Sequence, residues 1–174
     1  MSKEKASSVL YAKSQEEYGQ EYNDHILEMY KLYVTMADNI SSRRQTANSF
    51  FLTINTALVA IWGSAKHCFG EEALSVIWLL AICGIILCFA WYRLVRSYKD
   101  LNSAKFKVIH LIEQQLPLSP YDAEWESVGR GKNKKLYLPF THIEIFVPWI
   151  FLFIHALAIF ITCPWLRIFK SLLN

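Results

Sequence analysis

Residues 74–92 read LSVIWLLAICGIILCFAWY, nineteen consecutive residues without a charged side chain. A helix rises about 1.5 Å per residue, so a stretch of this length can cross a hydrocarbon core about 30 Å thick. A second uncharged block covers 145–162, with His155 as its only ionisable group, and a shorter, more polar block covers 49–64. The three blocks predict an all-α integral membrane protein with three transmembrane helices.

The basic residues are distributed unevenly around these blocks. Fifteen of the eighteen Lys and Arg residues lie before the first block or between the second and third, and three lie in the first turn or the C-terminal tail. Lys and Arg are concentrated in cytoplasmic segments of membrane proteins, and the first forty residues contain no apolar core of a signal peptide. We therefore expect a multi-pass protein with a cytoplasmic N-terminus. The net charge of +3 reflects this topology, and we expect no nucleic-acid partner.

The predicted order along the chain follows from these blocks and from breaks in helical periodicity. We expect a mobile N-terminus at 1–15, a cytoplasmic helix at 16–48, a first span at 49–65, an outer turn at 66–73, a second span at 74–92, a cytoplasmic helix and loop at 93–143, a third span at 144–163 and an outer interfacial tail at 164–174. Each of the first two spans continues into a cytoplasmic helix with an apolar stripe. Pairing of the stripes predicts a long antiparallel hairpin with helical cytoplasmic extensions.

Polar residues in the first block need an environment other than lipid. Small and hydroxyl side chains recur there at spacings of four and three, which places them on one helix face. Such faces let helices approach closely and form hydrogen bonds between them. Asn55 is costly against lipid and should also point into protein or water. The candidates for an oligomer contact or a pore lining are Ser49, Thr53, Asn55, Thr56 and Ala60.

Ionisable residues in or beside a span are candidates for function. His142 and Glu144 lie at the inner mouth of the third span, and His155 lies within it. Glu144 has two interpretations, an ion pair with a cytoplasmic Arg or Lys and a proton or ion role. His155 is either a neutral ring hydrogen-bonded inside a helix bundle or a pH sensor.

The sequence contains no recognisable catalytic or cofactor-binding pattern. His142 and Glu144 lack a third ligand at metal spacing, and no nucleophile, base and orienting acid come together along the chain. We therefore expect no metal, no cofactor and no enzymatic activity. An enzyme that acts on lipid near Glu144 and His142 is the weakest of the three hypotheses.

Basic residues at the inner face are expected to contact lipid headgroups. The stretch GRGKNKK lacks the spacing of a phosphate-binding loop, so contact with anionic lipid, or simple solvation, is the expectation. The candidates are Arg43, Arg44, Arg130, Lys132, Lys134 and Lys135.

The four cysteines divide between the second span and the outer side. Cys83 and Cys88 lie within the span, where we expect them to be inert packing residues. Cys68 and Cys163 both lie on the outer side in this topology, so they could form a disulfide in an oxidising periplasm.

Three stretches carry a resemblance to a known family. They are YKLYVTMADNISSRRQTANSFFLTINTAL at 30–58, LPLSPYDAEWESVG at 116–129 and LYLPFTHIEIFVPWIF at 136–151. Together they resemble the RipA-like family of small octameric bacterial inner-membrane proteins. The resemblance implies a homo-oligomer of the bacterial cytoplasmic membrane, associated in some bacteria with adaptation to life inside host cells. It implies no catalytic residues.

Two functions fit these features. The first is a non-enzymatic homo-oligomer, octameric by resemblance, that acts as a scaffold or sensor at the inner membrane. Its partners would be membrane lipid, further copies of the chain and a cytoplasmic protein bound by the cytoplasmic helices. The alternative is an oligomeric pore or a membrane-perturbing effector, in which Thr53, Asn55 and Thr56 line a central path. The same polar face supports both.

Overall fold

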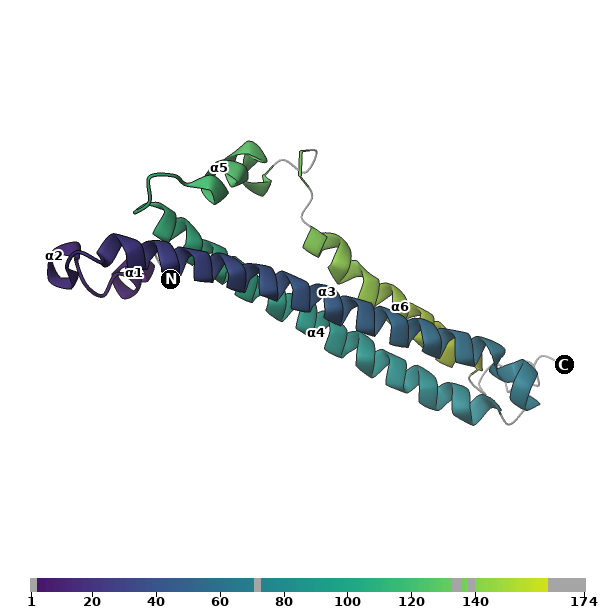
Figure 1. The fold of residues 1–174 in the computed structure, drawn as a ribbon. Coiled ribbons are helices and arrows are strands. Elements are labelled where there is room, and N and C mark those ends of the chain that lie inside the picture. Colours follow the sequence, from purple (N-terminus) through teal and green to yellow (C-terminus); the bar gives the residue numbers. More distant parts are fainter. Residues whose placement is uncertain (1–2, 71–72, 133–135, 138–139, 163–174) are drawn as a thin grey trace. The chain divides into compact units, whose positions relative to one another are not determined.

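Every regular element in the described part of the chain is helical (Figure 1), as the sequence predicts. The structure is a computed structural model and describes residues 3–70, 73–132, 136–137 and 140–162. The elements are α1 (Lys3–Leu10), α2 (Gln15–Tyr18), α3 (Tyr22–Phe69), α4 (Ala73–Glu113), α5 (Pro120–Ser127), the 3₁₀ helix η2 (Gly129–Gly131) and α6 (Phe140–Thr162).

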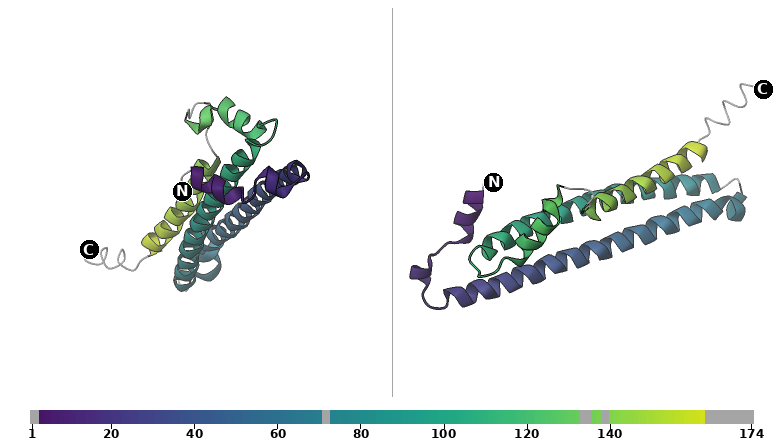
Figure 2. Two further views of the ribbon diagram at one scale, coloured as in Figure 1. Left: turned by 90° about the vertical axis from the view of Figure 1, so that its left-hand side faces the viewer. Right: turned by 90° about the horizontal axis from the view of Figure 1, so that it is seen from above.

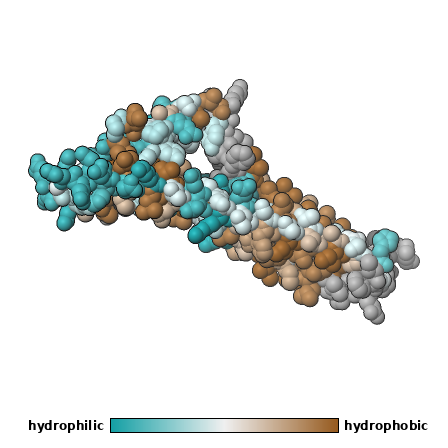
Figure 3. Space-filling view, viewed as in Figure 1, coloured by the Kyte–Doolittle hydropathy of each residue, from teal (hydrophilic) through white to brown (hydrophobic). Residues whose placement is uncertain are grey.

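The chain divides into two compact units, to which α3 and α4 both contribute. We call Met1–Arg43 with Tyr98–Pro139 the polar unit, and Arg44–Ser97 with Phe140–Asn174 the apolar unit. On the face shown in Figure 3, hydrophobic side chains gather over the apolar unit. The apolar unit contains the described parts of all three apolar blocks.

The N-terminal region differs from the prediction. The segment 1–15, predicted to be mobile, contains helix α1, and the Tyr11 hydroxyl beyond it donates a 2.6 Å hydrogen bond to the Leu111 carbonyl of α4. The long helix begins at Tyr22 rather than at residue 16, because Gly19 takes a φ of 97° that ends α2. Glycine adopts such a conformation without steric cost.

In the polar unit, the first half of α3 runs antiparallel to the end of α4. The Tyr30 hydroxyl bonds Glu113, and the Lys105 ammonium lies 4.8 Å from the centre of the Tyr33 ring. The predicted apolar stripe of α3 is only partly correct, because Ile40 is buried whereas Met29 is 48% exposed.

In the apolar unit, α3 and α4 are also antiparallel. Asn48 of α3 accepts a 2.7 Å hydrogen bond from Trp91 of α4. Ala65, which lies later in α3, packs against Ile77, which lies earlier in α4. The Trp91 ring stacks on Phe51 at a centroid distance of 5.8 Å. These contacts agree with the predicted hairpin.

Helix α6 runs parallel to α3 and antiparallel to α4 in this unit (Figure 2). Arg44 pairs with Glu144, and Asn55 bonds His155. The residue numbers of the paired positions therefore increase in the same direction along α3 and α6. His155 also lies against Gly84 of α4. The apolar unit therefore alternates direction from α3 to α4 to α6.

Two helical stretches are long and apolar enough to cross a membrane, Ile77–Glu113 and Ile143–Thr162. Large apolar side chains remain exposed along both, including Ile86 at 61% and Phe153 at 67%. A soluble domain rarely exposes a contiguous apolar surface of this kind. The block 49–64 of α3 is more polar and is not one of these two stretches, so its membrane crossing stays a prediction.

Gly84 sets the distance between α4 and α6. A Cβ atom added there would lie 2.4 Å from the Cε1 and Nε2 atoms of the His155 ring. Helices of membrane proteins use small residues in this way to bring their backbones together. Gly63, by contrast, has no atom within 4 Å of an added Cβ.

Gly84→Ala is expected to destabilise the protein, because the new methyl group must displace a buried ring. Overpacking of this kind costs about 1–3 kcal/mol. Unfolding in mixed micelles of mild detergent and sodium dodecyl sulfate measures the change. The matched control, Gly63→Ala, should be neutral or stabilising by up to about 1 kcal/mol, because alanine favours the helix. Equal stability of wild type and Gly84→Ala would contradict the packing described here.

Candidate functional site

The interior of the apolar unit contains a polar cluster made of Asn55, Cys88 and His155, one residue from each of its three helices. All three are buried, with exposures of 0–1%. The Asn55 Oδ1 atom accepts hydrogen bonds from the Cys88 thiol at 3.2 Å and from His155 Nε2 at 3.1 Å. The Asn55 amide group donates to the Phe51 carbonyl at 2.8 Å. We call these three residues the interior polar cluster.

The hydrogen-bond directions in this cluster are fixed by chemistry. An amide oxygen only accepts, so the His155 ring carries a proton on Nε2 when it bonds Asn55. His155 Nδ1 has no hydrogen-bond partner among the described residues. This arrangement agrees with the interpretation of His155 as a hydrogen-bonded ring inside a bundle. Cys88 was expected to be an inert packing residue but donates its S–H to Asn55, and Cys83 is exposed.

Asn55 does not share a face with the other polar residues of its helix, and its prediction as a pore-facing or oligomer-facing residue is wrong for the subunit described. Ser49, Thr53, Thr56 and Ala60 are all exposed, whereas Asn55 is 0% exposed. The physical reason is that Asn55 completes its hydrogen bonds inside the subunit. The four exposed residues remain candidates for contacts outside it.

Glu144 pairs with Arg44, one of the two interpretations that the sequence left open. The Arg44 Nε atom lies 3.5 Å from Glu144 Oε2, and both side chains are about four-fifths buried, with exposures of 19% and 21%. Arg44 is therefore engaged within the subunit rather than free for lipid headgroups. The side chain of His142 lies outside the described residues.

The basic stretch after α5 is also partly engaged. Arg130 bonds the carboxylate of Glu126 through Nε and lies 3.2 Å from Asp122 through Nη1. Its charge is thus balanced by two carboxylates, which weakens the prediction that it contacts lipid. Arg43 and Lys132 are exposed and retain that role as a prediction.

Several predicted residues cannot be placed. Lys134, Lys135, Cys163 and the tail 164–174 lie outside the described residues, as does the side chain of Cys68. The predicted disulfide between Cys68 and Cys163 therefore stays a prediction. Among the described residues, no group of three or more His, Cys, Asp and Glu side chains could hold a metal ion.

The polar unit contains a buried carboxylate that the sequence reasoning missed. Glu113, the last residue of α4, is 1% exposed. Its Oε1 atom accepts from the Tyr121 N–H at 2.9 Å and from the Tyr30 hydroxyl at 3.0 Å. Its Oε2 atom accepts from the Asp122 N–H at 3.1 Å and lies 3.3 Å from His110 Nδ1. Glu113 thus satisfies the free N–H groups at the start of α5.

This carboxylate acts on its neighbours. Burial and the hydrogen bond to Glu113 raise the pKa of Tyr30 to about 12, so the phenol remains a donor at physiological pH. The available sequence signal was that Glu113 follows the apolar Ile109 by four residues and so shares its helix face, and the structure shows that Ile109 is buried. A charge at such a position requires partners, and these come from a segment that the sequence did not place beside it.

Comparison with known proteins gives a family. A model described as the octameric membrane protein family (8xMP) matches residues 27–164, which is well over half of the chain. No curated protein matches the chain, and no solved structure does.

Glu113→Ala is expected to free the start of α5, because it leaves the N–H groups of Tyr121 and Asp122 without an acceptor. Losing a buried partner of this kind costs about 1–3 kcal/mol. Amide hydrogen exchange at Tyr121 and Asp122 should accelerate by about 5- to 150-fold. Glu113→Gln keeps one acceptor oxygen and should have a smaller effect, and the exposed Glu124→Ala serves as the control. Unchanged exchange in Glu113→Ala would show that the carboxylate does not hold this helix.

Proposed function

The chain belongs to the octameric membrane protein family, and from that premise we propose that it is a non-enzymatic homo-octamer that acts as a scaffold or sensor in the bacterial cytoplasmic membrane. The family and the two candidate spans support the membrane location. The earlier resemblance to RipA-like proteins supports a role in the adaptation of a bacterium to host cells.

The packing of α3 against its neighbours in the apolar unit supports three spans. Residues 44–65 of α3 lie against α4 and α6 through Arg44, Asn48, Asn55 and Ala65. If α4 and α6 cross the bilayer, residues 44–65 of α3, which pack against them, cross the bilayer as well. Its polar groups are tolerated because Asn55 is bonded inside the bundle and Thr53 donates to the Ser49 carbonyl at 2.8 Å.

The exposed small face of α3 supports subunit contact. Ser49, Thr53, Thr56 and Ala60 present little side-chain bulk, so a helix of a second copy can approach closely. The Thr53 hydroxyl already bonds its own backbone, so this residue needs no water at a helix contact. Cytoplasmic protein partners and lipid headgroups would then meet the polar unit.

One observation favours a scaffold or sensor over a pore, namely the burial of Asn55. The pore hypothesis relied on this residue as the most polar group of a central path. In the structure its amide is fully buried and bonded to Phe51, Cys88 and His155 within one subunit. The remaining candidates for a pore lining are small hydroxyl residues, which fit a helix contact equally well.

Topology reporters test the three spans. Fusions of alkaline phosphatase and green fluorescent protein after Lys66, Lys132 and Asn174 should report outside, inside and outside respectively. The reason is that each span reverses the side of the membrane, with the Lys-rich and Arg-rich segments kept in the cytoplasm. A cytoplasmic signal after Lys66 would show that the first segment does not cross the membrane. A cytoplasmic signal after Asn174 would show the same for the third.

Substitution on the small face tests the octamer. Ala60→Trp should shift the assembly in nanodiscs from eight copies to smaller species, because the indole prevents close approach of a second helix. Native mass spectrometry counts the subunits. Ile86→Trp is the control, because Ile86 belongs to a surface of large apolar side chains where further bulk meets lipid. Octamers that persist in Ala60→Trp would show that subunits associate elsewhere.

The same preparations separate the scaffold from the pore. Liposomes that contain the wild-type octamer should retain potassium as well as empty liposomes do. A potassium flux that Thr56→Val abolishes, with the octamer intact, would contradict the scaffold and support a pore. Asn55→Leu is unsuitable for this test, because it would remove the hydrogen bonds of the interior polar cluster.

A further inference from the structure

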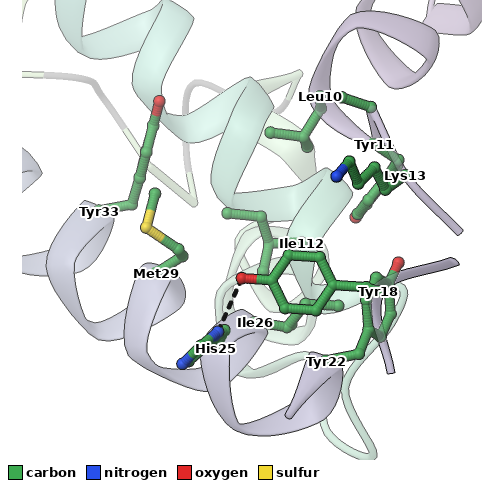
Figure 4. A pocket seen from close by; sticks show the side chains of 11 residues that line it. Leu10, Tyr11, Lys13, Tyr18, Tyr22, His25, Ile26, Met29, Tyr33 and Ile112 are labelled. Carbon is green, nitrogen blue, oxygen red and sulfur yellow. Dashed lines mark hydrogen bonds between the residues drawn. The ribbon is translucent and has the colours of Figure 1, made fainter. Parts of the chain in front are cut away.

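The polar unit contains a pocket of about 350 Å³ at the meeting point of the N-terminal segment, α3 and α4 (Figure 4). This volume lies at the lower end of the range for sites that bind small molecules. Four tyrosines line it, together with aliphatic and thioether side chains such as Ile26, Met29 and Ile112. Among the described residues the lining is thus aromatic and apolar, and Lys13 and His25 are its basic residues.

Hydrogen bonds through the hydroxyl group hold two of the lining tyrosines in place. The Tyr11 hydroxyl donates to the Leu111 carbonyl at 2.6 Å, and the Tyr18 hydroxyl lies 2.8 Å from His25 Nδ1. Figure 4 shows the Tyr18 oxygen directed at His25. With their hydroxyls engaged in this way, Tyr11 and Tyr18 contribute mainly their rings. An apolar ligand body can pack on them without leaving buried polar groups unsatisfied.

The charge of the lining favours an anion. No carboxylate lies among the described residues that line the pocket. Lys13 has neither an ion-pair nor a hydrogen-bond partner among the described residues. His25 is engaged by Tyr18 and lies 3.8 Å from Glu21, so Lys13 is the group left to meet a ligand charge.

A cationic ligand fits less well. Several tyrosines around a pocket can bind an ammonium group through their ring faces. Here the Tyr33 ring already faces the Lys105 ammonium, 4.8 Å from the ring centre. A second cation would meet Lys13 and Lys105 and find no carboxylate in the lining.

We propose that this pocket binds a small amphiphilic anion, a molecule with an aromatic or branched aliphatic body and a single carboxylate. The body packs between the tyrosine rings, Ile26 and Met29, and the carboxylate pairs with Lys13. Most of the lining residues precede residue 27, where the family match begins, and they come from the N-terminal segment and the start of α3. The site lies wholly in the polar unit.

Fluorine NMR of the full-length protein in nanodiscs tests the proposal. The probes are 4-(trifluoromethyl)benzoate, its neutral amide and the matching benzyl trimethylammonium, with empty nanodiscs as the reference for partition into lipid. The benzoate should bind saturably, and the cationic probe should not. Lys13→Gln should weaken benzoate binding about tenfold while leaving the amide unchanged, because it removes one charge-assisted hydrogen bond.

Two further variants complete the experiment. Lys31→Gln is the matched control, since Lys31 is an exposed cation of the polar unit that pairs with Glu28 and does not line the pocket. Met29→Trp fills the cavity and should abolish binding of both the benzoate and the amide. The proposal is overturned if the benzoate does not bind at millimolar concentration, if the ammonium probe binds more tightly, or if Lys13→Gln and Lys31→Gln change affinity equally.

Discussion

The constraint on which the apolar unit depends is that a buried side-chain amide needs hydrogen-bond partners. Asn55 meets this constraint for three helices at once, because it bonds its own helix, Cys88 of α4 and His155 of α6. In a medium without water an unpaired amide costs several kcal/mol. The helices can therefore align only where these three residues meet. Gly84 then lets α4 and α6 come close enough for the contact.

In the polar unit, a buried carboxylate has the same need for hydrogen-bond partners. Glu113 is buried and lies at the end of α4, where its two oxygens receive two backbone N–H groups of α5, the Tyr30 hydroxyl and His110. A buried carboxylate with four neighbours of this kind joins three separate pieces of chain. Both units thus use one polar side chain to set the register of helices whose apolar contacts alone would allow several alignments.

The polar residues of this chain divide into those with a partner inside the subunit and those left to meet other molecules. Asn55, His155 and Glu144 were functional candidates because they are polar or ionisable near the membrane, yet each has a partner within the subunit. The groups that remain available are different ones, the small face of α3 in the apolar unit and Lys13, which lies beside the tyrosine-lined pocket and has no partner among the described residues. Interaction with other molecules is therefore to be sought at these two places and not at the buried polar residues.

The sequence by itself determined the all-α class, the three apolar blocks, the helical hairpin and the family resemblance, because each depends on local periodicity, length or composition. It also named Arg or Lys as a partner for Glu144, although not which one. Only the tertiary structure decided that Asn55 faces inward, that Glu113 holds α5, and that the first fifteen residues help to form a pocket. The physical reason is that several of these contacts join residues 83 to 100 positions apart and the others depend on helix rotation or on how a loop folds back. A helix pattern does not specify which polar residue finds a partner across the bundle.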